Sequence, residues 1–440
     1  MMNKYVWLLA LTAFNVTECF ANTQPTFSLV ANTPTAITVP ANRHAYVQYR
    51  VTNNTSVTRT LTMTPIPNVT QVTTGNTCSN PFTLGRNQSC NLTLYIDGAL
   101  QRSDYSGGPV ICKANSNNTP NPFLCSQPEQ SMVLSIHQAP AVIPTTNKLY
   151  VSNWDGGSIS MCSIANSGNI FDCLVSAVSD TFLNPEALAI NGNYLFVANI
   201  GGGISSCSID INTGELTNCS NAINDNTATA VNGPDGIAIQ VVNQDTFAYI
   251  ANSSADDASK QGVTKCTVSG PSLSNCTFTN GGHPEYFSIP SDLALFNNTA
   301  YITNFNSQTI ATYCTDGNLT CTVGTVGTIT SDPSLLNEPE GLFITTINTT
   351  AYAYFTNHGS HTVTRCVVTA PTNFNSCYNT EGYFTGFGNL TILASPLKAF
   401  IPSGLKTIAL CNVNSTTGAL SDCIDSTELS FNNPSGLVIK

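Results

Sequence analysis

Charged residues are scarce in this chain of 440 residues. They make up 9% of the sequence, with 14 Lys and Arg against 25 Asp and Glu, whereas soluble domains usually carry about a quarter. Asparagine, threonine and serine supply the polarity instead. The few basic residues form no patch, so nucleic acid is not an expected partner. The net charge of -11 favours solubility and favours cationic partners only weakly.

Motifs of several enzyme classes are also missing. The sequence contains no C-x2-C, no G-x-S-x-G, no P-loop and no G-x-G-x-x-G that opens a helix, which removes the usual signatures of zinc sites, serine hydrolases and nucleotide binding. Of the five histidines, His283, His358 and His361 flank predicted strands. Surface loops explain them as well as a general base or a metal ligand does. No motif therefore assigns a reaction.

Long apolar runs are absent beyond the beginning of the chain. Residues 5–14 are apolar and a polar stretch follows them up to Ala21, a pattern that predicts a signal peptide over residues 1–21. Ten residues are too few to span a bilayer. A lipoprotein with an acylated Cys19 is the alternative, although Glu18 replaces the small residue that such signals need. Both interpretations predict export.

Two short phrases recur along the last two thirds of the chain. The first opens with proline and reads PEALAI, PDGIAI, PSDLAL, PEGLFI and PSGLVI, beginning at 185, 234, 290, 339 and 434, with a weaker copy at 387–393. The second reads LYVSN, LFVAN, AYIAN, AYITN, AYFTN and AFIPS, ending at 153, 199, 252, 304, 357 and 403. Six copies of each, spaced by roughly 45 to 60 residues, predict four-stranded propeller blades.

The two series are offset by one unit. The second phrase that ends at Asn153 has no first phrase before it, and the first phrase at 434–439 has nothing after it. The C-terminal strand is therefore expected to complete the first blade and to remove two open sheet edges. The predicted fold is all-β, with a β-sandwich at 22–138, a linker at 139–146 and a six-bladed β-propeller at 147–440.

Cleavage after Ala21 leaves sixteen of the seventeen cysteines. They fall into neighbouring pairs: Cys78 with Cys90, Cys112 with Cys125, Cys162 with Cys173, Cys207 with Cys219, Cys266 with Cys276, Cys314 with Cys321, Cys366 with Cys377, and Cys411 with Cys423. Turn residues lie between the members of every propeller pair, so each pair is predicted to bridge one hairpin without backbone distortion. Each bridge is worth roughly 2 to 3 kcal/mol, and the set predicts an oxidising compartment.

In the N-terminal third, apolar and polar residues alternate as they do in β-strands, but the two repeated phrases are absent. Residues 46–52 form a strand, Asn53-Asn54 a turn, and 59–63 a strand that is expected to pair back, followed by strands at 90–96 and 132–136. The phrases YRVTNNTSVTRTLTM and FTLGRNQSCNLTLYI resemble the immunoglobulin-like modules of bacterial surface and secreted proteins.

The phrases LYVSN, LFVAN, AYIAN and AYITN, with their proline-initiated partners, resemble the NHL and YVTN class of propellers. The resemblance implies the fold of residues 147–440. It does not choose a function, because propellers serve as hydrolases, lyases and pure binding modules.

In propellers of this class the first strand begins, and the second ends, on one face of the central channel. That face is expected to gather Glu186, Asp235, Asp292 and Glu340 with Asn199, Asn252 and Asn304. Carboxylate and amide oxygens suit calcium, and the arrangement is similar to that of six-bladed calcium lactonases of the gluconolactonase and paraoxonase type. Crowded acids should also raise the pKa of at least one carboxyl group.

A purely structural interpretation explains the same residues. The asparagines would cap tight turns and the acids would solvate the channel mouth. Asp292 lies one place out of step with the other acids, so one of the four is expected to point elsewhere.

The sequence as a whole predicts an exported binding protein for a protein or glycan ligand, located in the secreted, periplasmic or cell-surface space. A calcium-dependent lactonase or esterase is the first alternative, and a structural spacer at the cell surface is the second.

Overall fold

The computed structural model describes residues 25–74, 77–101, 103–140, 147–282, 284–307, 309–314, 324–327, 335–370, 373–380, 384–386, 388–426 and 431–440. These residues form nine β-sheets and four single-turn 3-10 helices, so the all-β prediction is confirmed. The predicted signal peptide, His283, Cys321 and residues 141–146 of the predicted linker lie outside the described residues. Among the described residues, no helix is long and apolar enough to cross a membrane.

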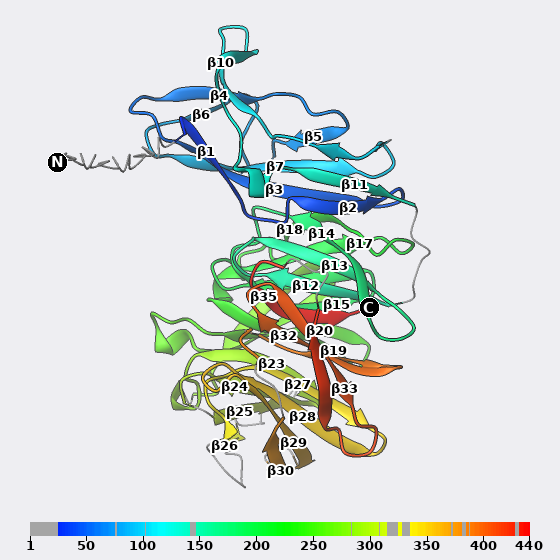
Figure 1. Cartoon of the computed structure of the whole chain (residues 1–440). Coiled ribbons are helices and arrows are strands. Elements are labelled where there is room, and N and C mark those ends of the chain that lie inside the picture. Colours follow the sequence, from blue (N-terminus) through cyan, green and yellow to red (C-terminus); the bar gives the residue numbers. More distant parts are fainter. Residues whose placement is uncertain are drawn as a thin grey trace, which may run out of the picture.

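Residues 25–140, called here the N-terminal module, form three sheets (Figure 1). Their strand orders are β1-β3-β7-β5, β10-β9-β4-β6 and β2-β11-β8. The strands are β1 (Phe27–Ala31), β2 (Ala36–Pro40), β3 (His44–Asn53), β4 (Arg59–Met63), β5 (Val69–Val72), β6 (Phe82–Leu84), β7 (Ser89–Asp97), β8 (Tyr105–Ser106), β9 (Ile111–Ala114), β10 (Pro120–Ser126) and β11 (Ser135–Ala139), with η1 at Gln130–Met132.

The predicted hairpin between 46–52 and 59–63 is wrong. β3 pairs with β1 and β7, whereas β4 pairs with β6 and β9 in another sheet. Alternate residues of β3, including Val47 and Tyr49, are buried in the same core as Leu61 of β4. Two strands that face one core from opposite sheets cannot pair with each other, so the chain crosses between sheets after Asn53.

Residues 147–440 form six four-stranded antiparallel sheets. Their innermost strands are β35 (Pro434–Ile439), β15 (Pro185–Asn191), β19 (Pro234–Val242), β23 (Pro290–Phe296), β27 (Pro339–Ile347) and β31 (Thr391–Ala394). The second strands are β12 (Lys148–Asn153), β16 (Tyr194–Asn199), β20 (Asp245–Asn252), β24 (Thr299–Asn304), β28 (Thr350–Asn357) and β32 (Leu397–Gly404).

The third strands are β13 (Ser158–Ile164), β17 (Ile204–Ile209), β21 (Gly262–Ser269), β25 (Thr309–Cys314), β29 (Thr362–Ala370) and β33 (Thr407–Val413). The outermost strands are β14 (Ile170–Val178), β18 (Leu216–Asn221), β22 (Ser272–Thr279), β26 (Gly324–Gly327), β30 (Asn373–Asn379) and β34 (Leu420–Asp425). Single 3-10 turns occur as η2 (Ala228–Ala230), η3 (Ala258–Lys260) and η4 (Pro284–Tyr286).

The last strand of the chain belongs to the first of these sheets. β35 pairs antiparallel with β12, with Leu149 opposite Ile439, as the offset of the two phrases predicts. Its other side contacts β15 and β31. β15, β19, β23 and β27 contact one another in that order. Where β27 meets the segment before β31, a Cβ on Gly341 would lie 2.4 Å from the carbonyl oxygen of Gly388, so only glycine allows this approach.

The second strands are buried on both faces and hold neighbouring sheets together. Phe196 of β16 packs on one side with Ile250 of β20, while Leu195 and Val197 pack on the other side with Tyr150 of β12. Burial of both faces explains the continuous apolar runs in these phrases. At about 25 cal/mol per Å² of buried apolar surface, such contacts make each sheet depend on its neighbours.

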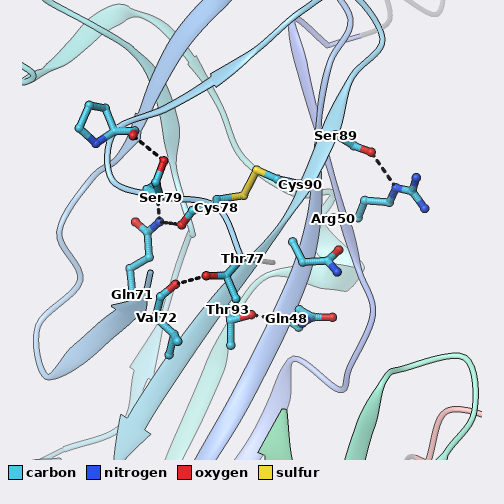
Figure 2. Close-up of a disulfide and its surroundings, with 12 residues drawn as sticks. Gln48, Arg50, Gln71, Val72, Thr77, Cys78, Ser79, Ser89, Cys90 and Thr93 are labelled. Carbon is cyan, nitrogen blue, oxygen red and sulfur yellow. Dashed lines mark hydrogen bonds between the residues drawn. A yellow bond between two sulfur atoms is a disulfide. The ribbon is translucent and has the colours of Figure 1, made fainter. Parts of the chain in front are cut away.

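Seven of the eight predicted disulfides are confirmed: Cys78–Cys90, Cys112–Cys125, Cys162–Cys173, Cys207–Cys219, Cys266–Cys276, Cys366–Cys377 and Cys411–Cys423. The predicted Cys314–Cys321 pair lies partly outside the described residues. Figure 2 shows that Cys78–Cys90 ties a loop to β7.

The expectation that the hairpins need no backbone distortion is wrong. In each of the five described disulfide pairs at 147–440, the register of the two paired strands shifts at the first cysteine. The residue before the second cysteine has a φ near +50° in each case: Asp172, Asn218, Asn275, Ser376 and Asp422. Each bridge therefore closes across a β-bulge, which places one extra residue opposite a single partner.

The N-terminal module docks on the outer edge of the six-sheet part, beside β14 and β18 (Figure 1). Leu174 of β14 joins the core of the module. Glu215, in the turn before β18, accepts a hydrogen bond from the backbone N–H of His44 at 2.7 Å. Its carboxylate also lies 2.7 Å from His44 Nδ1 and 3.7 Å from Arg43 Nε. The contact therefore contains a buried ion pair between Arg43 of the N-terminal module and Glu215 of the six-sheet part.

Candidate functional site

One edge of the six-sheet part carries a repeated loop geometry. The proline that opens each of five innermost strands lies opposite the asparagine that ends the second strand of the same sheet. This register confirms that both sequence phrases meet on one face. The residue before each proline has a positive φ of 51–56°: Asn184, Gly233, Ile289, Glu338 and Asn433. Its carbonyl accepts a hydrogen bond from the N–H of the residue after the asparagine.

The asparagines on this edge bind their own loops. Asn252 Oδ1 accepts from Asn232 N at 2.9 Å and its Nδ2 donates to Thr264. Asn304 Oδ1 accepts from Ser288 N at 3.1 Å and its Nδ2 donates to Tyr286 and Thr309.

Asn199 departs from this pattern at one atom. Its Nδ2 donates to Val197, Gly203 and Ser205, whereas its buried Oδ1 has no hydrogen-bond partner. None of the three predicted asparagine ligands lines the cavities described below. Their role matches the turn-capping interpretation.

The four predicted acids come together at the innermost strands. Glu186, Asp235 and Glu340 line the floor of an open cavity of about 280 Å³. These three acids and Asp292 line a smaller cavity of about 10 Å³ next to it, which has room for about one water molecule. Glu186, Asp235 and Asp292 are 3–7% exposed. The structure thus confirms the convergence of acids that the repeat predicts.

Asp292 lies out of step, as expected. Its Oδ2 accepts a hydrogen bond from the N–H of Leu342, in the neighbouring strand β27, at 2.8 Å. Asn389 makes the equivalent bond to the N–H of Leu437 in β35, also at 2.8 Å. Asp292 therefore ties two innermost strands together, while its Oδ1 is buried without a hydrogen-bond partner.

Burial raises the pKa of all four acids. Burial raises the pKa of Glu186 to about 7, although a hydrogen bond from Ser435 opposes the shift. Burial, followed by the negative charges of Glu186, Glu340 and Asp292, raises the pKa of Asp235 well above its ordinary value. Burial also raises the pKa of Asp292 to about 7. The predicted rise in carboxyl pKa is therefore present.

Glu340 is the acid whose negative charge the protein stabilises least. Burial first, and then the charges of Glu186 and Asp292, raise its pKa well above the ordinary range. Its Oε2 is buried and has no hydrogen-bond partner. Among the residues that line either cavity, in the part of the chain that the structure describes, none is a lysine or arginine.

The walls of the larger cavity come from residues that the sequence analysis did not single out. Trp154, Ile200, Phe305 and His358 line it, and each directly follows the asparagine of a second strand. The repeated loop therefore presents a different side chain from each sheet at the same place. The signal was visible as variation: asparagine recurs, whereas the next residue changes from sheet to sheet.

His358 is the wall residue that carries a titratable ring. Its ring lies 5.5 Å from the ring of Phe305, and its Nδ1 lies 3.5 Å from Glu338. Burial lowers the pKa of His358, and the charge of Glu338 opposes that shift. Burial therefore favours the neutral form of the imidazole.

The site does not fit the predicted calcium. Throughout the described residues, no group of three or more His, Cys, Asp or Glu side chains is arranged to hold a metal ion. The amide oxygens of Asn252 and Asn304, which were expected to complete the shell, accept hydrogen bonds from their own loops, and Asn199 lines neither cavity. Calcium needs six to eight oxygens, and these residues do not provide them around one point.

Comparison with known proteins gives no family. No family model matches the chain, and no curated protein matches it. Among solved structures, the chain is similar to one described as a nidogen/laminin complex, with 14% identity over 67% of this chain and 98% of that chain and a TM-score of 0.47.

Two further structures come from Bacteroides species. One is a putative 6-phosphogluconolactonase of Bacteroides fragilis, with 13% identity over 68% of this chain and all of that chain and a TM-score of 0.44. The other is a DUF4784 family protein of Bacteroides caccae, with 10% identity over 93% of this chain and 98% of that chain and a TM-score of 0.41. Likenesses at this level assign no function.

Proposed function

We propose that this protein is an exported recognition protein that binds its ligand at the mouth of a six-bladed propeller. The six four-stranded sheets are its blades, β35 closes the ring, and residues 22–138 form an immunoglobulin-like module ahead of a short linker. Seven disulfides support an oxidising compartment, such as the secreted, periplasmic or cell-surface space.

One observation carries the proposal of a binding site. The cavity of about 280 Å³ has a largely apolar wall, which includes the imidazole of His358, and an acidic floor, and its walls come from the equivalent position of four different sheets. Small-molecule sites are typically concave, mostly apolar and equipped with a few convergent polar groups. A site assembled from one variable position per blade can change its ligand without disturbing the asparagine turns beneath it.

A hydrolase is the second candidate, because Glu186 has a pKa of about 7 in the floor of the cavity, a value suited to proton transfer at neutral pH. The calcium that this alternative called for does not fit the residues present. Hydrolysis of lactone or ester substrates that is lost in Glu186→Gln would favour this candidate over pure recognition.

The binding site can be tested through its own tryptophan. Trp7 lies in the predicted signal peptide, so Trp154 is the only tryptophan of the mature chain. Glycans, peptides and small molecules would be titrated against residues 22–440 while Trp154 fluorescence is recorded. We expect a saturable change that Phe305→Ala abolishes and that Phe123→Ala preserves, because Phe123 is 92% exposed on β10 of the N-terminal module. Binding that leaves Trp154 fluorescence unchanged and survives Phe305→Ala would contradict the proposal.

A further inference from the structure

We propose that the group recognised at this mouth is a protonated alkylamine, carried by a small molecule or by a lysine side chain. This inference rests on the proposed binding function. Its physical basis is that the cavity combines buried carboxylate oxygens that have no hydrogen-bond partner with an aromatic and aliphatic wall. No lysine or arginine of the described residues lines it.

The floor lacks a counter-charge. Asp292 is 3% exposed, lines the smaller cavity, and has an Oδ1 without a hydrogen-bond partner. Glu340, which lines both cavities, has an Oε2 without a hydrogen-bond partner. No ion pair between described residues involves these two acids, Glu186 or Asp235. A buried carboxyl group without a partner takes up a proton, and it stays ionised only when a cation pairs with it. The cation that would keep these acids ionised is expected to come with the ligand.

The kind of cation follows from the walls. A metal ion requires several oxygens around one centre, and no group of described side chains provides that arrangement. An alkylammonium group needs fewer acceptors, since it has three N–H donors on one atom. Its carbon chain can lie against Ile200, and its charge is attracted by the ring faces of Trp154 and Phe305.

The size of the cavity limits the ligand. A volume of about 280 Å³ is at the lower end for small-molecule sites, and it accommodates a short amine or the end of one lysine side chain. A lysine would reach the floor with its ammonium group while its apolar stem lies along the wall. One binding chemistry therefore serves a free amine and a protein partner.

The test uses residues 22–440 and reads Trp154 fluorescence together with calorimetry. The probes are n-butylamine, n-butanol as its neutral analogue, calcium chloride, and a peptide with one central lysine beside its Nε-acetylated form. We expect saturation with butylamine and no response to butanol at the same concentrations. The lysine peptide should bind and its acetylated form should not. If the peptide binds more tightly than butylamine, the source of the amine is a protein partner, whereas the reverse order indicates a free amine.

Variants decide whether the floor makes the contact. Glu340→Gln keeps the shape and removes the charge, and we expect it to weaken butylamine binding at least tenfold. Asp245→Asn, at an exposed acid that begins β20, is the matched control and should bind as the unaltered chain does. Circular dichroism spectra would show that both variants are folded.

Three results would overturn the inference: equal responses to butylamine and butanol, unchanged binding by Glu340→Gln, or a saturable calcium signal that competes with butylamine. Neutral ligands that bind through Phe305 while amines do not would refute the amine and leave the recognition function standing. A mouth that binds no ligand of any class would refute the recognition function itself.

Discussion

The buried carboxyl groups of this molecule lie in two contrasting electrostatic environments, one with cationic partners and one without. Glu215, at the contact between the N-terminal module and the six-sheet part, is 8% exposed and lies beside Arg43 and His44. At the mouth, Glu186, Asp235 and Asp292 are buried to the same degree, and among the described residues no lysine or arginine lines their cavities. Glu215 therefore has a structural role, because its charge is paired within the protein. The mouth acids are expected to receive their cation from a ligand.

The largest effect tests how far the mouth depends on ring closure. Deleting residues Pro434–Lys440 removes β35, the hydroxyl of Ser435 that donates to Glu186, and the buried side chain of Leu437. It also exposes β12 as an open edge. We expect the six-sheet part to lose its cooperative fold, which size-exclusion chromatography and circular dichroism would show. A soluble monomer with an unchanged unfolding midpoint would contradict the closure scheme.

Removing the paired acid should be costly. Glu215→Gln leaves the buried guanidinium of Arg43 without its carboxylate, and breaking a buried pair in this way costs about 3 kcal/mol. Urea unfolding would measure the loss. Asp104→Asn breaks an exposed contact to His137 and serves as the control, with no measurable change expected. Equal stability of Glu215→Gln and the unaltered chain would remove the contrast between the two groups.

Neutralising a mouth acid should stabilise the folded protein, whereas neutralising Glu215 should destabilise it. The pKa of Glu186 is raised to about 7 in the folded chain, so the folded state holds a proton that the unfolded state releases near pH 4.5. The stability contributed by this group is present below pH 4.5 and is lost as the pH rises through 7. We expect Glu186→Gln to flatten this part of the pH profile and to stabilise the protein by about 2 kcal/mol at pH 8. A variant whose midpoint falls more steeply with pH than that of the unaltered chain would contradict the assignment.

The smallest expected effect on stability comes from the backbone conformation of a loop at the mouth, not from the charge of the mouth acids. Ile289 occupies the positive-φ position that asparagine or glycine fills in three other sheets, and this conformation costs a β-branched residue roughly 1 kcal/mol. Ile289→Asn should therefore raise stability by about 0.5 to 1 kcal/mol. Ile211→Asn, at a position 76% exposed, is the control and should have no effect. A clear loss of stability in Ile289→Asn would show that the side chain matters more than its backbone.

Much of this architecture is readable from the sequence because the repeat fixes register. Proline at one strand start and asparagine at the next strand end recur together, so the face that gathers Glu186, Asp235 and Glu340 follows from the pattern. Neighbouring cysteines around turn residues predict their own pairing for the same reason. The bulges at 147–440 were also open to prediction, since Asp or Asn precedes the second cysteine in four of the five described pairs there and these residues tolerate positive φ.

Other features depend on contacts between distant parts of the chain. The pairing of Arg43 with Glu215 joins the module to a turn between two later strands, and no local pattern encodes it. The hairpin between 46–52 and 59–63 was expected because a two-residue turn separates two alternating strands, but both strands bury a face in one core from opposite sheets. The sequence also could not show that the asparagine amides, such as that of Asn252, bind their own loops, because those contacts depend on how each loop folds.

The most direct measurement of the contrast between the two groups is the melting temperature of Glu340→Gln beside the unaltered mature chain at pH 8, with and without millimolar n-butylamine. Without amine, the variant should melt at a higher temperature, because a neutral amide replaces a buried carboxylate that has no cation. The amine should raise the melting temperature of the unaltered chain and leave that of Glu340→Gln nearly unchanged. A variant that melts lower, or an amine that stabilises both chains equally, would contradict the assignment of these acids to a cationic ligand.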